Sequence, residues 1–147
     1  MSAATRTMFL GHGAERTGPP ILLGHLLDGL ASIGGHEATV LVARSGPMLE
    51  RYRAAGARVA TLGPRREPLE PLAAALRRVG AGERARHLQD RRRRSVARPL
   101  LPVDLVWVNG ATPPTAALLR ALAPPPSTPV VLHVHELGIG LHLNLDP

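Results

Sequence analysis

The sequence predicts an α/β protein with a Rossmann-like parallel sheet flanked by helices. Short apolar runs alternate with longer stretches of helical periodicity, and glycine or proline separates most of them. Such alternation is typical of βαβ units, in which right-handed crossovers join parallel strands. With 147 residues, 44% of them hydrophobic, the chain has about the length of one domain and can bury one core.

Five short segments are predicted to be strands because they are apolar and mostly end at glycine or polar residues. The run Val40-Leu41-Val42 is typical of a strand that is covered on both faces. The predicted strands are residues 7–10, 38–43, 58–62, 104–108 and 129–134.

Five further segments are predicted to be helices. In the first, leucines recur with i, i+3, i+4 spacing, two prolines suit the first turn, and a Gly-Gly pair ends the periodic run. Gly24 and Gly29 weaken this helix unless close packing uses them. The predicted helices are residues 19–33, 47–55, 69–79, 83–97 and 115–122.

Composition excludes several kinds of chemistry. The chain has no cysteine and no lysine, so it has no thiolate nucleophile, no Schiff-base lysine and no P-loop lysine. Its three aromatic residues are too few for a base-stacking platform, and we expect no nucleic-acid partner. No signal peptide or membrane-spanning run is evident. We therefore expect a cytoplasmic protein.

The net charge of +7 is concentrated in one segment. Residues 77–98, predicted to be an arginine-rich helical connector, hold nine arginines and two acidic residues, while the remainder is electrically balanced. Asp90 is expected to pair with Arg94 four residues on. One interpretation is a solvated connector. The other is peripheral contact with an anionic inner-membrane face, through arginines that spread around nearly a full helical turn: Arg91, Arg92, Arg93 and Arg94.

Candidate binding residues follow the first, fourth and fifth predicted strands. The carboxyl ends of parallel strands lie at one edge of a sheet, and ligands bind there at the point where the strand order reverses. We therefore expect these segments to converge. The candidates are His12, Arg16, Thr17, Gly18, Asn109, His133 and Glu136.

The first loop contains G-x-G but no third glycine at the dinucleotide spacing, because Arg16 stands there. Its backbone N–H groups and the following helix can still hold a phosphate beside Arg16, or the glycines serve only a tight turn. His133 and His135 are predicted to share one side of their strand. They can hydrogen-bond a polar ligand or be satisfied within the fold. A metal site would need a third ligand from elsewhere, and we expect none.

Five phrases of the sequence stand in an informative order: HGAERTGPP at residues 12–20, GHEATVLV at 35–42, GPMLE at 46–50 with AAGARV at 54–59, DLVWVN at 104–109, and HVHEL at 133–137. Together they resemble the N-terminal domain of bacterial GT-B glycosyltransferases of the retaining, subfamily-four type. The resemblance covers roughly residues 7–63 and 104–138.

The resemblance implies that residues 1–147 form a truncated, acceptor-side half of a GT-B enzyme that transfers a sugar from a nucleotide-sugar donor. In such enzymes a second Rossmann-like domain holds most of the donor. That domain would have to come from a missing C-terminal part or a partner subunit, so the chain alone is expected to be inactive. Thr17 and Gly18 correspond to the loop near donor phosphate and acceptor. His135 corresponds to a histidine that hydrogen-bonds the transferred sugar, which makes it the catalytic candidate. No cofactor or metal is implied.

Two alternatives from other classes stay open. The chain can be a stand-alone Rossmann-like module that binds a nucleotide or phosphosugar without catalysis. It can also be a basic adaptor that associates with a membrane.

Overall fold

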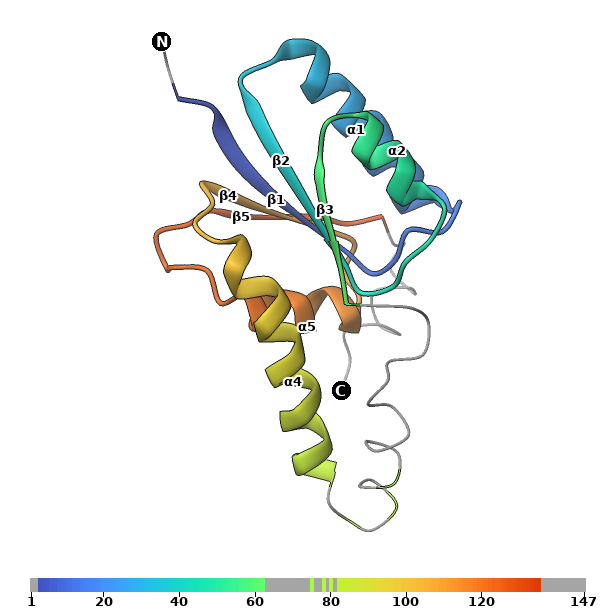
Figure 1. Cartoon of the computed structure of the whole chain (residues 1–147), viewed down its shortest axis with the longest axis vertical. Coiled ribbons are helices and arrows are strands. Elements are labelled where there is room, and N and C mark those ends of the chain that lie inside the picture. Colours follow the sequence, from blue (N-terminus) through green and yellow to red (C-terminus); the bar gives the residue numbers. More distant parts are fainter. Residues whose placement is uncertain (1–2, 63–74, 76–77, 79, 81, 136–147) are drawn as a thin grey trace.

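A computed structural model describes residues 3–62, 75, 78, 80 and 82–135. It confirms the predicted class: one five-stranded sheet, with every strand parallel to its neighbours, in the order β3-β2-β1-β4-β5. Figure 1 shows the sheet with helices on both of its faces. The strands are β1 (Thr5–Gly11), β2 (His36–Val42), β3 (Arg58–Thr61), β4 (Leu105–Asn109) and β5 (Val130–His133).

The helices divide between the two faces of the sheet. One face is covered by α1 and α2, and the other by α4 and α5 (Figure 1). The described helices are α1 (Gly18–Ile33), α2 (Met48–Ala54), α4 (Gly82–Ala97) and α5 (Pro113–Leu122), with a short 3-10 turn, Arg98–Leu100, after α4. The helix predicted at residues 69–79 lies almost entirely outside the described residues.

Two apolar cores lie on opposite faces because successive side chains of a strand alternate. In β1, Phe9 packs toward α1 and α2, whereas Met8 and Leu10 pack toward α4 and α5. Tyr52 of α2 is fully buried in the first core, where its hydroxyl donates a 2.9 Å hydrogen bond to the carbonyl oxygen of Pro20. Burial raises the pKa of this hydroxyl above its ordinary value of 10.0. The two cores together hold both layers of helices on the sheet.

Side chains at the amino edge of the sheet tie β1 to β4. The guanidinium of Arg6 donates two hydrogen bonds to Asp104, of 3.1 and 2.8 Å, and the Arg6 main-chain N–H donates a third, of 2.8 Å. This fork lowers the pKa of Asp104 from 3.8 to about 2. β1 starts at Thr5, two residues before the predicted strand, because Thr5 and Arg6 pair with the start of β2.

Proline chemistry explains where α5 begins. The prediction placed its start at Thr115, but the helix starts at Pro113. Thr112 is the N-cap and forms a reciprocal capping box with Thr115, while Pro113 and Pro114 occupy positions where a missing N–H costs nothing. The main-chain N–H groups of Thr112 and Thr115 are thus each bonded to the side chain of the other residue.

The two glycines of α1 have different surroundings. A Cβ on Gly24 would stand 3.1–3.2 Å from atoms of Arg51 and Met48, so the close approach of α2 uses this glycine. A Cβ on Gly29 would meet nothing within 4 Å. The expectation that packing uses the helix glycines is therefore met at Gly24 and not at Gly29.

Candidate functional site

The candidate site lies at the carboxyl edge of the sheet, where β1 and β4 are neighbours. The chain moves outward from β1 through β2 to β3, and from β4 to β5 in the opposite direction. The crevice between the loops that follow β1 and β4 is therefore the point at which the strand order reverses, the usual place for a ligand in an open parallel sheet.

Asn109, the last residue of β4, bridges this crevice. Its side chain is buried, with the residue 3% exposed. The Nδ2 atom donates a 3.0 Å hydrogen bond to the carbonyl oxygen of Pro19 in the first turn of α1. The Oδ1 atom lies 2.8 Å from Nε2 of His135. One side chain thus connects the ends of β4, α1 and β5.

These two contacts fix the hydrogen positions at His135. A main-chain carbonyl can only accept, so the amide nitrogen of Asn109 must face Pro19 and its oxygen must face His135. The partner of that oxygen must donate, so Nε2 of His135 carries the hydrogen. In the neutral ring, Nδ1 therefore bears the lone pair.

The two histidines of the predicted pair lie on one side of the sheet, as their spacing predicted. Their ring centroids are 4.1 Å apart. The ring of His133 also meets Trp107 of β4 edge-on, with centroids 5.4 Å apart and an interplanar angle of 78°. Trp107 in turn contacts Phe9 in the core. The two histidines thus join a chain of ring contacts that reaches the core through Trp107 and Phe9.

A hollow of about 390 Å³ opens beside this cluster, between α1 and the ends of β4 and β5. Asn109 and His133 contribute polar atoms, and the indole N–H of Trp107 is buried without a partner among the described residues. No acidic or arginine side chain lines the hollow. Its lining residues are Leu22, Leu23, His25, Leu26, Trp107, Asn109 and His133. The lining is thus mostly apolar with a few polar groups, as is usual for small-molecule sites.

The contribution of α1 and of Trp107 to this hollow was not predicted from the sequence. Leu22, His25 and Leu26 share one side of α1 by their i, i+3, i+4 spacing. Leu22 belongs to the predicted apolar stripe, yet it is 49% exposed in the structure. Because the apolar pattern does not show which leucines the core leaves uncovered, this side of the hollow has no signal in the sequence.

The loop after β1 is held by its own contacts. The carboxylate of Glu15 is folded over Gly13, at which a Cβ would overlap it, and pairs with Arg44 at 3.3 Å. One of its oxygens, Oε2, is buried without a hydrogen-bond partner among the described residues. The carbonyl of Ala14 accepts a 2.9 Å hydrogen bond from Met48 N–H, and the backbone of Gly46 packs against it. These contacts fix the loop against the start of α2.

The remaining predicted residues are less closely connected. Arg16, Thr17 and Gly18 are exposed, His12 is half-buried, and no hydrogen bond or ion pair links them to Asn109 within the described part of the chain. Glu136 lies outside the described residues. The structure therefore brings Asn109, His133 and His135 together, with the first loop beside them.

The start of α1 is poorly equipped to hold a phosphate. Pro19 and Pro20 have no N–H, the N–H of Thr17 is used by the Glu15 carbonyl at 2.9 Å, and Thr17 makes no side-chain cap. Only Gly18 has an N–H to offer in the first turn. A helix N-terminus binds an anion through several such groups, so the first turn of α1 contributes at most one amide to the predicted phosphate site.

Neither a candidate metal centre nor a membrane-spanning helix occurs among the described residues. Within residues 3–62 and 82–135 and the three isolated described positions, no group of three or more histidine, aspartate or glutamate side chains could hold a metal ion. None of the described helices has the length and apolar character to cross a membrane. No family model, curated protein or solved structure matches the chain significantly.

Proposed function

We propose that this chain is the acceptor-side domain of a GT-B-type glycosyltransferase, which transfers a sugar from a nucleotide-sugar donor to a hydroxyl-bearing acceptor. The observation that carries the proposal is the bridge made by Asn109 from Pro19 to His135, beside a hollow at the reversal point of the sheet. This bridge supports the resemblance of the five phrases, because it joins the first, fourth and fifth of them.

The lining of the hollow supports a sugar as the ligand. The leucines and Trp107 provide an apolar surface of the kind that packs against the C–H face of a sugar ring.

The prolines at the start of α1 fit an enzyme in which another domain binds the donor diphosphate and this chain binds the acceptor. If the donor diphosphate is bound mainly by a second domain or a partner subunit, this chain does not need several free amides at the helix start. The chain would then supply acceptor contacts and His135, and transfer would require the donor-binding part.

Trp107 gives the proposal a direct test, since it is the only tryptophan of the chain. Methyl hexosides and nucleoside-diphosphate hexoses are titrated into the 147-residue chain while Trp107 fluorescence and histidine NMR signals are recorded. We expect the hexosides to perturb Trp107, His133 and His135. We expect the Kd of a nucleotide sugar to be lower than that of the matching hexoside by a factor of less than about ten.

Two leucines of similar exposure provide matched variants. Leu22 lines the hollow and is 49% exposed, whereas Leu132 is 52% exposed and lines a separate hollow on the α5 face. Leu22→Gln should weaken hexoside binding and Leu132→Gln should not. Equal effects of the two variants, or no hexoside response at all, would contradict the proposal.

A stand-alone binding module is the second candidate, favoured by the glycine-containing loop at the reversal point. It predicts calorimetrically measurable binding of a nucleotide or phosphosugar much tighter than that of the free sugar, without transfer. Loss of this binding in Arg16→Gln would assign it to the first loop.

A further inference from the structure

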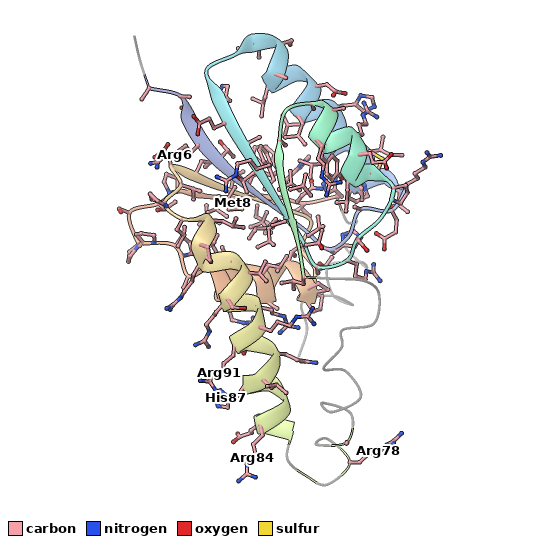
Figure 2. The ribbon with its side chains drawn as sticks, viewed as in Figure 1. Arg6, Met8, Arg78, Arg84, His87 and Arg91 are labelled. Carbon is pink, nitrogen blue, oxygen red and sulfur yellow. The ribbon has the colours of Figure 1, made fainter. Side chains whose placement is uncertain are left out.

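The side of α4 that faces away from the sheet carries a line of exposed arginines with one histidine among them. The members within α4 recur every three or four residues, so they occupy an arc of about 80° and span about 15 Å along the axis of an ideal helix. Figure 2 shows the first three projecting outward from α4. We name this set the α4 basic stripe: Arg84, His87, Arg91 and Arg94 of α4, with Arg98 of the 3-10 turn that follows.

The other arginines described on this helix are engaged within the fold. Arg92 donates a 2.6 Å hydrogen bond from Nη2 to the carbonyl oxygen of Leu62. Arg93 pairs with Asp90 at 3.0 Å, so the partner of Asp90 is Arg93 and not Arg94 as predicted. Within the described residues, no member of the stripe has a hydrogen-bond or ion-pair partner. Among the described residues, no direct contact compensates the charges of the four arginines of the stripe.

This corrects the surface expected from the sequence. Arg91, Arg92, Arg93 and Arg94 do spread around the helix, but Arg92 reaches the end of β3 and Arg93 pairs along the helix with Asp90. Arg91 and Arg94 remain exposed and align with His87 and Arg98. The opposite side of the helix is anchored in the core by Ala97 and Val96.

The stripe runs past the carboxyl edge of the sheet. Leu62 directly follows the last residue of β3, and it receives the hydrogen bond of Arg92. The turns of α4 that precede Arg92 therefore extend beyond the strands, as Figure 1 shows. Arg84, His87 and Arg91 lie on this protruding part, toward the edge that carries the candidate site.

We infer that the α4 basic stripe is a docking surface for an anionic lipid bilayer. A straight line of cations on a convex helix matches a flat array of lipid phosphates, and guanidinium groups bind phosphate in a bidentate manner. The stripe contains no apolar side chain, so the helix would lie at the level of the head groups without insertion. Binding would then be reversible and sensitive to salt.

The observations favour lipid over nucleic acid as the source of the phosphates. The stripe has no aromatic, asparagine or glutamine side chain with which to stack on or read a base. Phe9 and Tyr52 are buried in the core and Trp107 supports the histidines. A nucleic-acid duplex has two phosphate backbones, and the described residues offer no second basic helix face for the other one.

The test is co-sedimentation of the full chain with phosphatidylcholine vesicles, with and without phosphatidylglycerol. The stripe variant is R84Q/R91Q/R94Q. The matched control is R53Q/R58Q/R120Q, which removes the same charge from exposed arginines of α2, β3 and α5. An arginine near an anionic surface contributes roughly fivefold to partitioning, so the stripe variant should bind on the order of 100-fold more weakly.

We expect wild type and control to bind only the anionic vesicles, and salt to release them. Equal losses in both triple variants would show an effect of net charge alone and would overturn the inference. So would unchanged binding of the stripe variant. Tighter retention on duplex DNA than on vesicles, with the same dependence on the stripe, would reassign the surface to nucleic acid. The comparison of the two vesicle types and of DNA uses the wild-type chain alone. It can therefore still refute the inference if the stripe variant does not fold.

Discussion

Asn109 and His135 are 26 residues apart in the chain, yet Oδ1 of the first lies 2.8 Å from Nε2 of the second. The amide of Asn109 cannot turn over, because its nitrogen donates to the carbonyl oxygen of Pro19. The main chain of α1 therefore determines, through one buried side chain, which nitrogen of His135 carries the hydrogen. Asn109 acts on His135 as a positioning residue.

The first prediction concerns the ring of His135. Nitrogen-15 NMR of the neutral ring should show a protonated Nε2 and an unprotonated Nδ1, with the signals assigned by their loss in His135→Gln. Asn109→Asp should raise the pKa of His135, because a carboxylate at that oxygen favours the imidazolium. A neutral ring with its hydrogen on Nδ1 in the wild type would refute the arrangement.

The second prediction concerns acid stability. Because Arg6 lowers the pKa of Asp104 to about 2, Asp104 contributes stability that is present above its ordinary pKa of 3.8. That contribution is lost as the pH falls through about 2. In thermal melts, Asp104→Asn should lower Tm at pH 5, and the difference from wild type should shrink toward pH 2. A difference that stays constant over this range would contradict the ion-pair origin of the effect.

The third prediction compares two glycines. A Cβ on Gly46 would overlap the carbonyl of Ala14, which is backbone and cannot swing aside. Gly46→Ala should therefore cost about 1–3 kcal/mol in the free energy of unfolding. Gly29→Ala, with open space around it, should instead stabilise α1 by about 0.5–1 kcal/mol. Denaturant unfolding of the two variants should shift in opposite directions. If both shift the same way, the close contact between the two loops is not as described.

The fourth prediction uses Tyr52, the only tyrosine of the chain. Burial raises its pKa, so the folded protein should show no tyrosinate absorbance as the pH passes the ordinary value of 10.0. Tyr52→Phe leaves the carbonyl of Pro20 without its buried donor and should cost about 1–3 kcal/mol. Normal titration of Tyr52 in the folded chain would contradict its burial under α1.

Local sequence patterns were sufficient for the sheet. Residues such as Leu10 and Val40-Leu41-Val42 are buried on whichever face they occupy, so a continuous apolar run indicates a strand without knowledge of its neighbours. The convergence of Asn109, His133 and His135 followed from the same topology, since parallel strands place their carboxyl ends together.

What the sequence could not provide are contacts between distant main-chain atoms. The carbonyl of Pro19 is 90 residues from Asn109 and leaves no mark in the side-chain pattern. The orientation of the Arg92 side chain could not be predicted for a similar reason, because its partner is the main-chain carbonyl of Leu62. On a helical wheel Arg91 to Arg94 are equivalent, and they are separated by the bond of Arg92 to Leu62 and the pairing of Arg93 with Asp90.

The open edge of the sheet determines which part of the site is least firmly held. At the junction of β1 and β4, side chains lock both ends, through Arg6 with Asp104 and through Asn109 with Pro19. On the outer strand, Val130, Val131 and Leu132 are 38–52% exposed. Amide hydrogens of β5 should therefore exchange with solvent earlier than those of β1 and β4. A ligand that binds His133 and His135 should slow that exchange first, so local opening of one strand and occupancy of the site would be coupled.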